Sequence, residues 1–202
     1  MRATLWTRYA AFFVLAATGC WLDLATKSWI FDKLGMPGGP IWWVWEDVIG
    51  FQTSLNPGAL FGLGAGWGPL LVAVAIVALA AIAYWLFCKD GASDWLSTIA
   101  LGLITAGICG NLYDRLGLPG LVWEHDAAGQ RPGQPVAQVR DWILVMIGPY
   151  RWPNFNIADS LLVCGAGLLI LHAFWAASRQ QPPQPETAAT APHQPEKPEP
   201  PP

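Results

Sequence analysis

The sequence predicts an all-α membrane protein with four transmembrane helices and a small extracytoplasmic β-cradle or loop platform. Only 12% of its 202 residues are charged, against about 25% in soluble domains, and 53% are hydrophobic. The hydrophobic residues form blocks of roughly 20, the length that a helix needs to cross the hydrocarbon layer. We expect the spans at about residues 9–30, 69–88, 95–113 and 160–178.

The first span also resembles a targeting signal. Arg2 and Arg8 precede an apolar stretch that ends at Gly19-Cys20, as in a lipoprotein signal peptide. The apolar character continues to Ile30, however, and three further spans follow. We therefore expect this segment to be retained as the first helix.

The segments outside the spans differ in character. In the first outer loop, 31–68, the runs 41–45 and 51–55 are aromatic or alternating, which favours strands or an interfacial platform. The tail 179–202 holds nine prolines and no large apolar residue, so we expect it to be disordered.

Basic residues in short loops indicate the orientation of the chain. If the chain crosses four times, one side carries Arg2, Arg8, Lys89 and Arg179. Both termini are then predicted to be cytoplasmic. The second outer loop weakens the rule, because it also contains four arginines, namely Arg115, Arg131, Arg140 and Arg151.

Unusual polar residues gather at the outer ends of the predicted helices and in the outer loops. They are Asp23, Lys27, Asn56, Asn111, Asp114, Arg115, Asp141, Asn154, Asn156 and Asp159. Ionisable groups near hydrocarbon are costly, and their convergence at one level favours a functional site.

Each of these residues also has a structural interpretation. Asp23 and Lys27, spaced i,i+4, could neutralise one another on a helix face. Arg115 could extend toward the headgroups, and Asp159 or Ser160 could cap the last helix.

The polar residues at the outer ends of the helices suit catalysis by a pair of carboxylates best. The four cysteines are widely spaced, so neither a metal site nor a disulfide framework is expected, and no cofactor is implied. Two nearby carboxylates share a proton, so one can activate water while the other polarises an amide carbonyl. The residue types alone leave the pair open among Asp23, Asp114, Asp141 and Asp159.

Five ordered motifs resemble those of the lipoprotein signal peptidases (signal peptidase II, peptidase family A8). They are Asp23-Leu-Ala-Thr-Lys27, Asn56-Pro-Gly-Ala-Leu-Phe-Gly62, Gly110-Asn-Leu-Tyr-Asp-Arg115, Val139-Arg-Asp-Trp-Ile143 and Phe155-Asn-Ile-Ala-Asp-Ser160. Together they extend over roughly residues 20–178. The resemblance implies an aspartic endopeptidase with Asp141 and Asp159 as its catalytic pair.

The resemblance also implies roles for the neighbouring polar residues. Asn111, Arg115 and Asn156 would orient the pair and bind the substrate backbone. Asp114 would support Arg115 or the end of the third helix, and Asn56 would help to shape the outer-loop cradle. Asp23 and Lys27 complete the supporting set.

The implied reaction is cleavage of prolipoproteins before the Cys that carries diacylglycerol. The enzyme would lie in the bacterial inner membrane, with its site near the extracytoplasmic face. Its partners would be prolipoprotein signal peptides and membrane lipids, without nucleic acid.

The sequence departs from the family pattern in three places. A Gly/Pro-rich stretch, 117–138, is inserted before Asp141 and is either a lid or a neutral extension. Trp142 replaces the usual Phe, and Pro57 stiffens the Asn-x-Gly segment.

Two alternatives belong to other functional classes. A small transporter or channel would line a polar path with Asp23, Lys27, Asp114 and Asp159, but the inner halves of the later spans contain few polar groups. A non-catalytic scaffold lipidated on Cys20 would require loss of residues 1–19, which mass spectrometry of the N-terminus would reveal.

Overall fold

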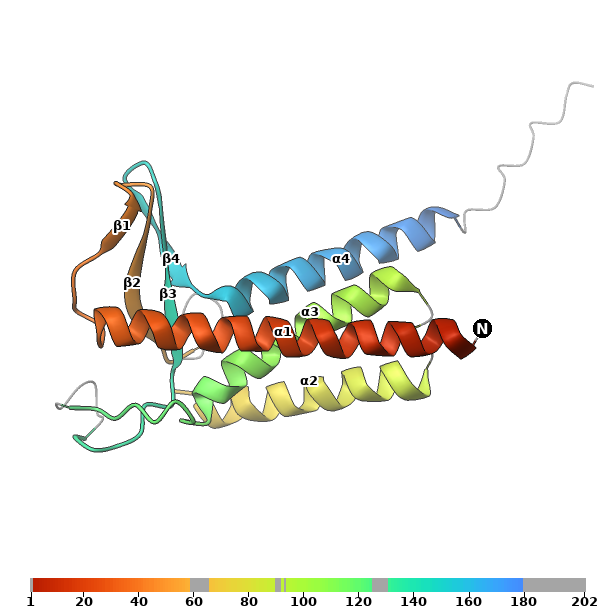
Figure 1. The fold of residues 1–202 in the computed structure, drawn as a ribbon, viewed down its shortest axis with the longest axis horizontal. Coiled ribbons are helices and arrows are strands. Elements are labelled where there is room, and N and C mark those ends of the chain that lie inside the picture. Colours follow the sequence, from red (N-terminus) through yellow and green to blue (C-terminus); the bar gives the residue numbers. More distant parts are fainter. Residues whose placement is uncertain (1, 59–65, 90–91, 93, 125–130, 180–202) are drawn as a thin grey trace, which may run out of the picture.

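The computed structural model describes residues 2–58, 66–89, 92, 94–124 and 131–179. The four helices are α1 (Arg2–Leu34), α2 (Gly68–Cys88), α3 (Trp95–Arg115) and α4 (Ile157–Arg179). All four are long and apolar enough to cross a membrane. They run side by side, and a small sheet stands across one end of the bundle (Figure 1). The predicted fold class, four spanning helices with a small β platform, is therefore confirmed.

All four helices extend beyond the expected spans, α1 and α4 by the most residues. α1 continues to Leu34 and is followed by Gly35, whose φ of +73° suits glycine and whose N–H donates to the Phe31 carbonyl at 2.9 Å. α4 begins at Ile157, three residues before the expected start at 160. Hydropathy marks the part of a helix that lies in hydrocarbon, whereas the backbone stays helical until a cap ends it.

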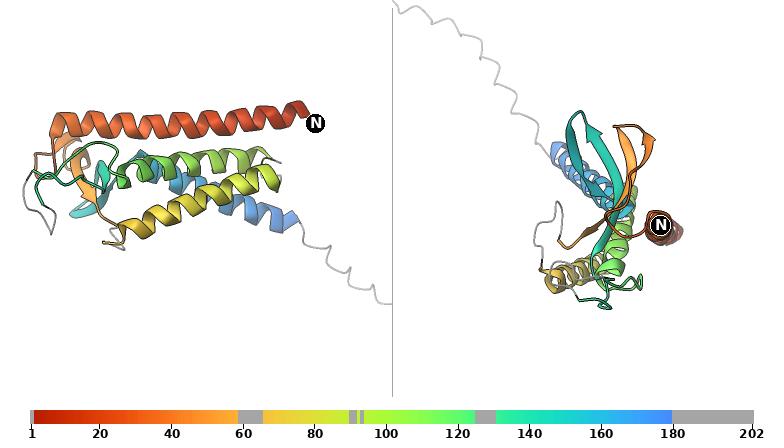
Figure 2. Two further views of the ribbon diagram at one scale, coloured as in Figure 1. Left: turned by 90° about the horizontal axis from the view of Figure 1, so that it is seen from below. Right: turned by 90° about the vertical axis from the view of Figure 1, so that its left-hand side faces the viewer.

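α3 is the central helix of the bundle. Half of its most apolar stretch is buried in the protein, against 6% for α2. Figure 2 shows α3 surrounded by the other three helices. Small residues allow this close approach: a Cβ on Gly107 would lie 2.6 Å from Leu162 Cγ, and one on Gly165 would lie 2.6 Å from Ile104 Cγ1.

The sheet is antiparallel, with the strand order β1-β2-β3-β4. Its strands are β1 (Trp42–Trp45), β2 (Ile49–Asn56), β3 (Val139–Ile147) and β4 (Tyr150–Phe155). The first two overlap the aromatic and alternating runs of the first outer loop. β3 and β4, which follow the inserted stretch, were not predicted from the sequence.

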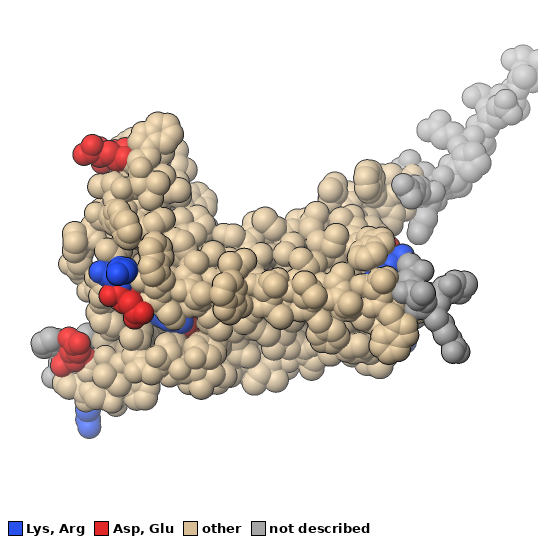
Figure 3. All heavy atoms as spheres, in the orientation of Figure 1, with Lys and Arg blue, Asp and Glu red and all other residues tan. Residues whose placement is uncertain are grey.

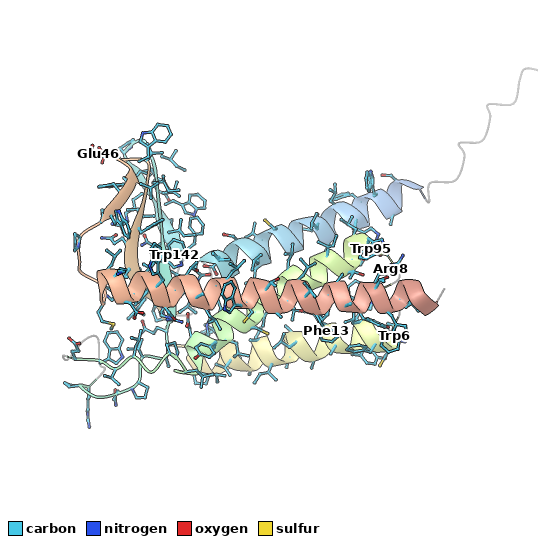
Figure 4. The ribbon with its side chains drawn as sticks, viewed as in Figure 1. Trp6, Arg8, Phe13, Glu46, Trp95 and Trp142 are labelled. Atoms are coloured by element: carbon cyan, nitrogen blue, oxygen red, sulfur yellow. The ribbon has the colours of Figure 1, made fainter. Side chains whose placement is uncertain are left out.

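A series of aromatic contacts packs the sheet against α1. Ring centroids are 5.9 Å apart for Trp29 and Trp42, 5.8 Å for Trp42 and Phe51, and 5.1 Å for Phe51 and Trp142. Trp142 is buried at the base of the sheet (Figure 4). The position that departs from the family pattern is therefore part of the joint between sheet and bundle.

Charged residues lie mainly at the two ends of the molecule. The face in Figure 3 carries almost no Lys, Arg, Asp or Glu along the helices, as a membrane requires. Glu46 lies at the tip of the sheet, and Arg8 lies near the opposite end of the bundle (Figure 4). Arg8 donates to the Ala92 carbonyl at 3.0 Å and lies 5.7 Å from the Trp95 ring centroid.

The inserted stretch folds back on itself where it is described. Val122 and Pro135 form a β-bridge, and the Val136 N–H donates to the Leu121 carbonyl at 2.8 Å. Residues 125–130 of the insertion, 59–65 of the first outer loop and the tail 180–202 lie outside the described residues. The expected disorder of the tail stays a prediction.

Candidate active site

Asp141 and Asp159 line the same cavity, which has a volume of about 960 Å³. Side chains alternate along a strand, so Val139 and Asp141 of β3 face the cavity while Arg140 between them faces the opposite side. Asp159 enters from the first turn of α4. The cavity lies between α2 and α4, with α3 residues Ile108, Asn111 and Arg115 also in its wall.

The first turn of α4 positions Asp159 by reciprocal capping. The Asp159 N–H donates to Asn156 Oδ1 at 2.9 Å, and the Asn156 N–H donates to Asp159 Oδ2 at 3.2 Å. This is the geometry of a capping box, in which two helix-end donors are satisfied by each other's side chains. The expectation that Asp159 or Ser160 caps the helix is wrong, because Asn156 is the cap and Asp159 lies three residues inside.

Two amide side chains connect the carboxylates. Asn156 Nδ2 donates to Asp141 Oδ1 at 2.6 Å and to Asn111 Oδ1 at 3.2 Å. Asn111 Nδ2 in turn donates to Asp159 Oδ1 at 2.8 Å. Asn56 Nδ2 reaches the other oxygen of Asp141 at 3.2 Å. Within the part of the chain that the structure describes, both carboxylates thus accept hydrogen bonds from amide groups, which hold them in one network.

The environment of Asp141 favours its protonated form. Burial, followed by the negative charge of Asp159, raises the pKa of the Asp141 carboxyl to about 7. Hydrogen bonds from Asn56 and Asn156 oppose this shift without cancelling it. A carboxyl that titrates near neutrality can donate or accept a proton at physiological pH.

Four other charged residues form a buried cluster next to the pair. Lys27 Nζ lies 2.7 Å from Asp23 Oδ2 and 3.0 Å from Asp114 Oδ2. Arg140 approaches Asp114 Oδ1 with Nε and with Nη2, each at 2.9 Å. All four side chains are almost completely buried. Two acids and two bases balance, which makes such burial tolerable. We call Asp23, Lys27, Asp114 and Arg140 the neutral cluster.

The neutral cluster is connected at three points to the elements that carry Asp141 and Asp159. Asp23 Oδ1 accepts the Ala158 N–H at the start of α4 at 2.9 Å. Asp114 Oδ2 accepts the Arg140 N–H at 3.0 Å, directly before Asp141 on β3. Lys27 Nζ donates to Asn111 Oδ1 at 2.9 Å. The cluster therefore fixes the main chain beside both carboxylates.

These contacts can be compared with the structural roles expected from the sequence. Asp23 and Lys27 do neutralise one another. Asp114 was expected to support Arg115 or the end of α3; its side chain accepts hydrogen bonds from Arg140 and forms ion pairs with Lys27 and Arg140. Arg115 instead donates to the Gly58 carbonyl at 2.8 Å.

Arg140 is a neighbour of the pair that the sequence pattern did not single out. It is 3% exposed, and its guanidinium also contacts Ser28 Oγ at 3.2 Å and the Phe31 ring at 5.9 Å. Its signal was available: a residue next to Asp141 on an alternating strand must face the bundle. An outer loop was expected around Asp141, and a loop has no such alternation.

Comparison with known proteins identifies the family. The Peptidase A8 family, described as signal peptidase (SPase) II, matches residues 15–175. A lipoprotein signal peptidase of Rhodopirellula baltica is 50% identical over 173 residues, which cover 83% of this chain and 73% of the relative. One of Aquifex aeolicus is 32% identical over 180 residues, covering 87% and 90% of the two chains.

A solved structure agrees with this relationship. A bacterial membrane enzyme determined by the in meso method at 2.3 Å resolution superimposes with a TM-score of 0.69 at 26% identity. The match covers 87% of this chain and 94% of that chain. The chain belongs to the signal peptidase II family, the bacterial membrane proteases that remove signal peptides from lipoproteins.

Proposed function

We propose that this protein is an aspartic endopeptidase that cleaves prolipoproteins before their diacylglyceryl-modified Cys, with Asp141 and Asp159 as the catalytic pair. One observation carries the proposal: two carboxylates from different elements meet in one cavity and are joined through Asn111 and Asn156. The cluster of charges beside them is already neutral, so this pair is the reactive one.

The contacts suggest different protonation states for the two acids. Asp159 accepts the Asn156 N–H and the Asn111 amide at the start of a helix, where a negative charge is favoured. Asp141, with a pKa of about 7, holds the shared proton. Asp159 then removes a proton from water as its oxygen attacks the carbonyl, and Asp141 protonates the developing oxyanion. Collapse of this intermediate, with proton transfer to the amide nitrogen, releases the two chains and regenerates the pair.

The cavity suits a substrate that remains partly in lipid. Its wall below the carboxylates is apolar and comes from α2 and α4, namely Leu71, Val74, Ala75, Ala78, Leu162 and Val163. A signal-peptide helix can lie between α2 and α4 while the acyl chains on its Cys stay in the bilayer. The polar groups are confined to the end near the sheet, where the peptide bond must be hydrolysed.

The sheet and the carboxylates lie on the extracytoplasmic side in this proposal, and both termini are cytoplasmic. Arg8 and Lys89 lie at the end of the bundle away from the sheet, which agrees with the preference of basic residues for the cytoplasm. A reporter fused after Arg179 tests the orientation, since it should be active only in the cytoplasm.

The decisive experiment is cleavage of a purified diacylated prolipoprotein by Asp141→Asn and Asp159→Asn variants. Each should lose at least about 10³-fold in rate, because an amide can neither take a proton from water nor donate one as an acid. Asp32→Asn, at an exposed position of α1, is the matched control and should cleave normally. Normal cleavage by both dyad variants would refute the assignment.

A further inference from the structure

The outer strand β4 presents its main chain to the catalytic cavity. In the described part of the chain, β4 pairs only with β3 and is an edge of the sheet. Five successive residues line the cavity, Arg151, Trp152, Pro153, Asn154 and Phe155. Side chains of a strand alternate between its faces, so an unbroken run of lining residues means that the strand edge itself borders the cavity.

Among the described residues, the pairing pattern leaves the main-chain N–H and C=O of Arg151 unpaired on this edge. Met146 of β3 lies opposite Arg151. The Met146 N–H donates to the Val48 carbonyl at 2.8 Å, on the β2 side of β3. Met146 and Arg151 therefore form a non-hydrogen-bonded pair, and the Arg151 N–H and C=O point away from β3. The irregularity in this ladder lies between Ile143 and Val145 and does not reach this pair.

The Arg151 side chain does not cover these groups. Its Nη2 donates to Gln52 Oε1, on β2, and to Asn154 Oδ1 at 3.1 Å. Because β3 lies between β2 and β4, the side chain crosses the face of the sheet and leaves the edge clear. Pro153, which lacks an N–H, is compatible only with an edge or a bulge of this kind.

We propose that the free edge of β4 binds the mature segment of the prolipoprotein, downstream of the lipidated Cys, as an added antiparallel or parallel strand. This inference rests on the proposed function. β4 leads through Asn156 directly to the catalytic pair, and the strand extends away from the bundle (Figure 1). The signal helix occupies the groove between α2 and α4, so the segment beyond the cleaved bond continues along β4.

The geometry sets the reach of this interaction. Arg151 precedes Phe155 by four residues, a distance of about 13 Å along a strand. The Arg151 main chain therefore pairs with a substrate residue roughly four positions beyond the scissile bond. Main-chain pairing supplies affinity without reading side chains, which suits an enzyme whose substrates differ after the Cys.

The first test compares Arg151→Pro with Arg151→Ala in the full-length enzyme. Both variants lose the guanidinium, but only proline also removes the outward N–H. Arg151→Pro should raise KM about 5-fold relative to Arg151→Ala with kcat unchanged, the effect of one hydrogen bond. Equal KM values in two variants of equal thermal stability would overturn the proposal.

The second test scans the substrate and does not depend on the folding of a variant. Diacylated peptides carry a single ester in place of one backbone amide at successive positions after the Cys. An added strand bonds through every second residue, so KM should rise at alternate positions only. Uniform or absent sensitivity would refute the docking mode, even if Arg151→Pro does not fold.

The catalytic roles of Asp141 and Asp159 and the docking on β4 can be refuted independently. If Asp141→Asn still cleaves, the proposed catalytic function is wrong. If Asp141→Asn is inactive while the ester scan shows no alternation, the catalytic pair stands and only the docking of the mature segment on β4 is wrong.

Discussion

Two groups of ionisable residues lie side by side and have different partners: the neutral cluster is buried throughout, whereas Asp141 is buried and Asp159 is half-buried. In the neutral cluster, each acid has a cationic partner within 3.0 Å. Asp141 and Asp159 instead receive hydrogen bonds from amides and border an open cavity. A paired charge is fixed and unreactive, whereas an acid that is buried beside another acid keeps its proton near neutral pH. The partner thus decides whether a buried carboxylate serves structure or chemistry.

Breaking the neutral cluster should give the largest loss of stability. Lys27→Met leaves two buried acids with only one base, and removing one member of a buried ion pair costs about 3–5 kcal/mol. We expect a much lower melting temperature in detergent. The double variant Lys27→Met/Asp114→Asn restores the charge balance and should recover part of the loss; no recovery would show that charge balance is not the cause.

Breaking the amide link should affect catalysis more than stability. Asn156→Ala removes the donor to Asp141 and the cap of α4, so we expect kcat to fall about 10²-fold and stability by about 1 kcal/mol. Asn154→Ala is a matched control, because Asn154 lines the same cavity and its amide bonds to the Gln52 carbonyl. Equal kcat values for the two variants would argue against the link.

The pH dependence of catalysis and of stability should report the titration of Asp141. With a pKa of about 7, the shared proton of Asp141 is lost above neutrality, so kcat/KM should fall on the alkaline side with a midpoint near pH 7. The folded pKa lies above that of an unfolded carboxyl, so the stability contributed by the protonated form is complete below about pH 4 and is lost as pH rises to about 7.

Asp141→Asn provides the control for this stability effect. Its melting temperature should decline less between pH 4 and pH 7 than that of the wild type, as followed by scanning calorimetry. Parallel curves for the two proteins would mean that Asp141 titrates at its ordinary value.

The smallest effect is expected at Gly110 of α3, which lies against Asp23 of the neutral cluster and Ala158 of α4. A Cβ on Gly110 would overlap Asp23 Oδ2 and lie 3.3 Å from Ala158 Cβ. Gly110→Ala should therefore destabilise the protein by about 1–3 kcal/mol. Gly167→Ala, where no atom lies within 4 Å of the added Cβ, should be neutral or slightly stabilising. Similar melting temperatures for both would show that α3 can shift away from α1.

Several features of this protein follow from its sequence alone. The four spans are evident because a hydrocarbon layer demands long uncharged segments, whatever the helices pack against. The gathering of polar residues at one membrane level is evident for the same reason, since each is costly anywhere else. The motifs then singled out Asp141 and Asp159 among four acids by resemblance.

Only the tertiary structure decided which charges neutralise one another. Asp114 and Arg140 are distant in sequence, and their pairing depends on β3 lying against α1 and α3. The capping of α4 by Asn156 and the exposure of the β4 edge likewise depend on contacts between separate segments. The local sequence pattern indicates which polar groups would be costly to bury. The partner that offsets this cost is determined by the tertiary packing.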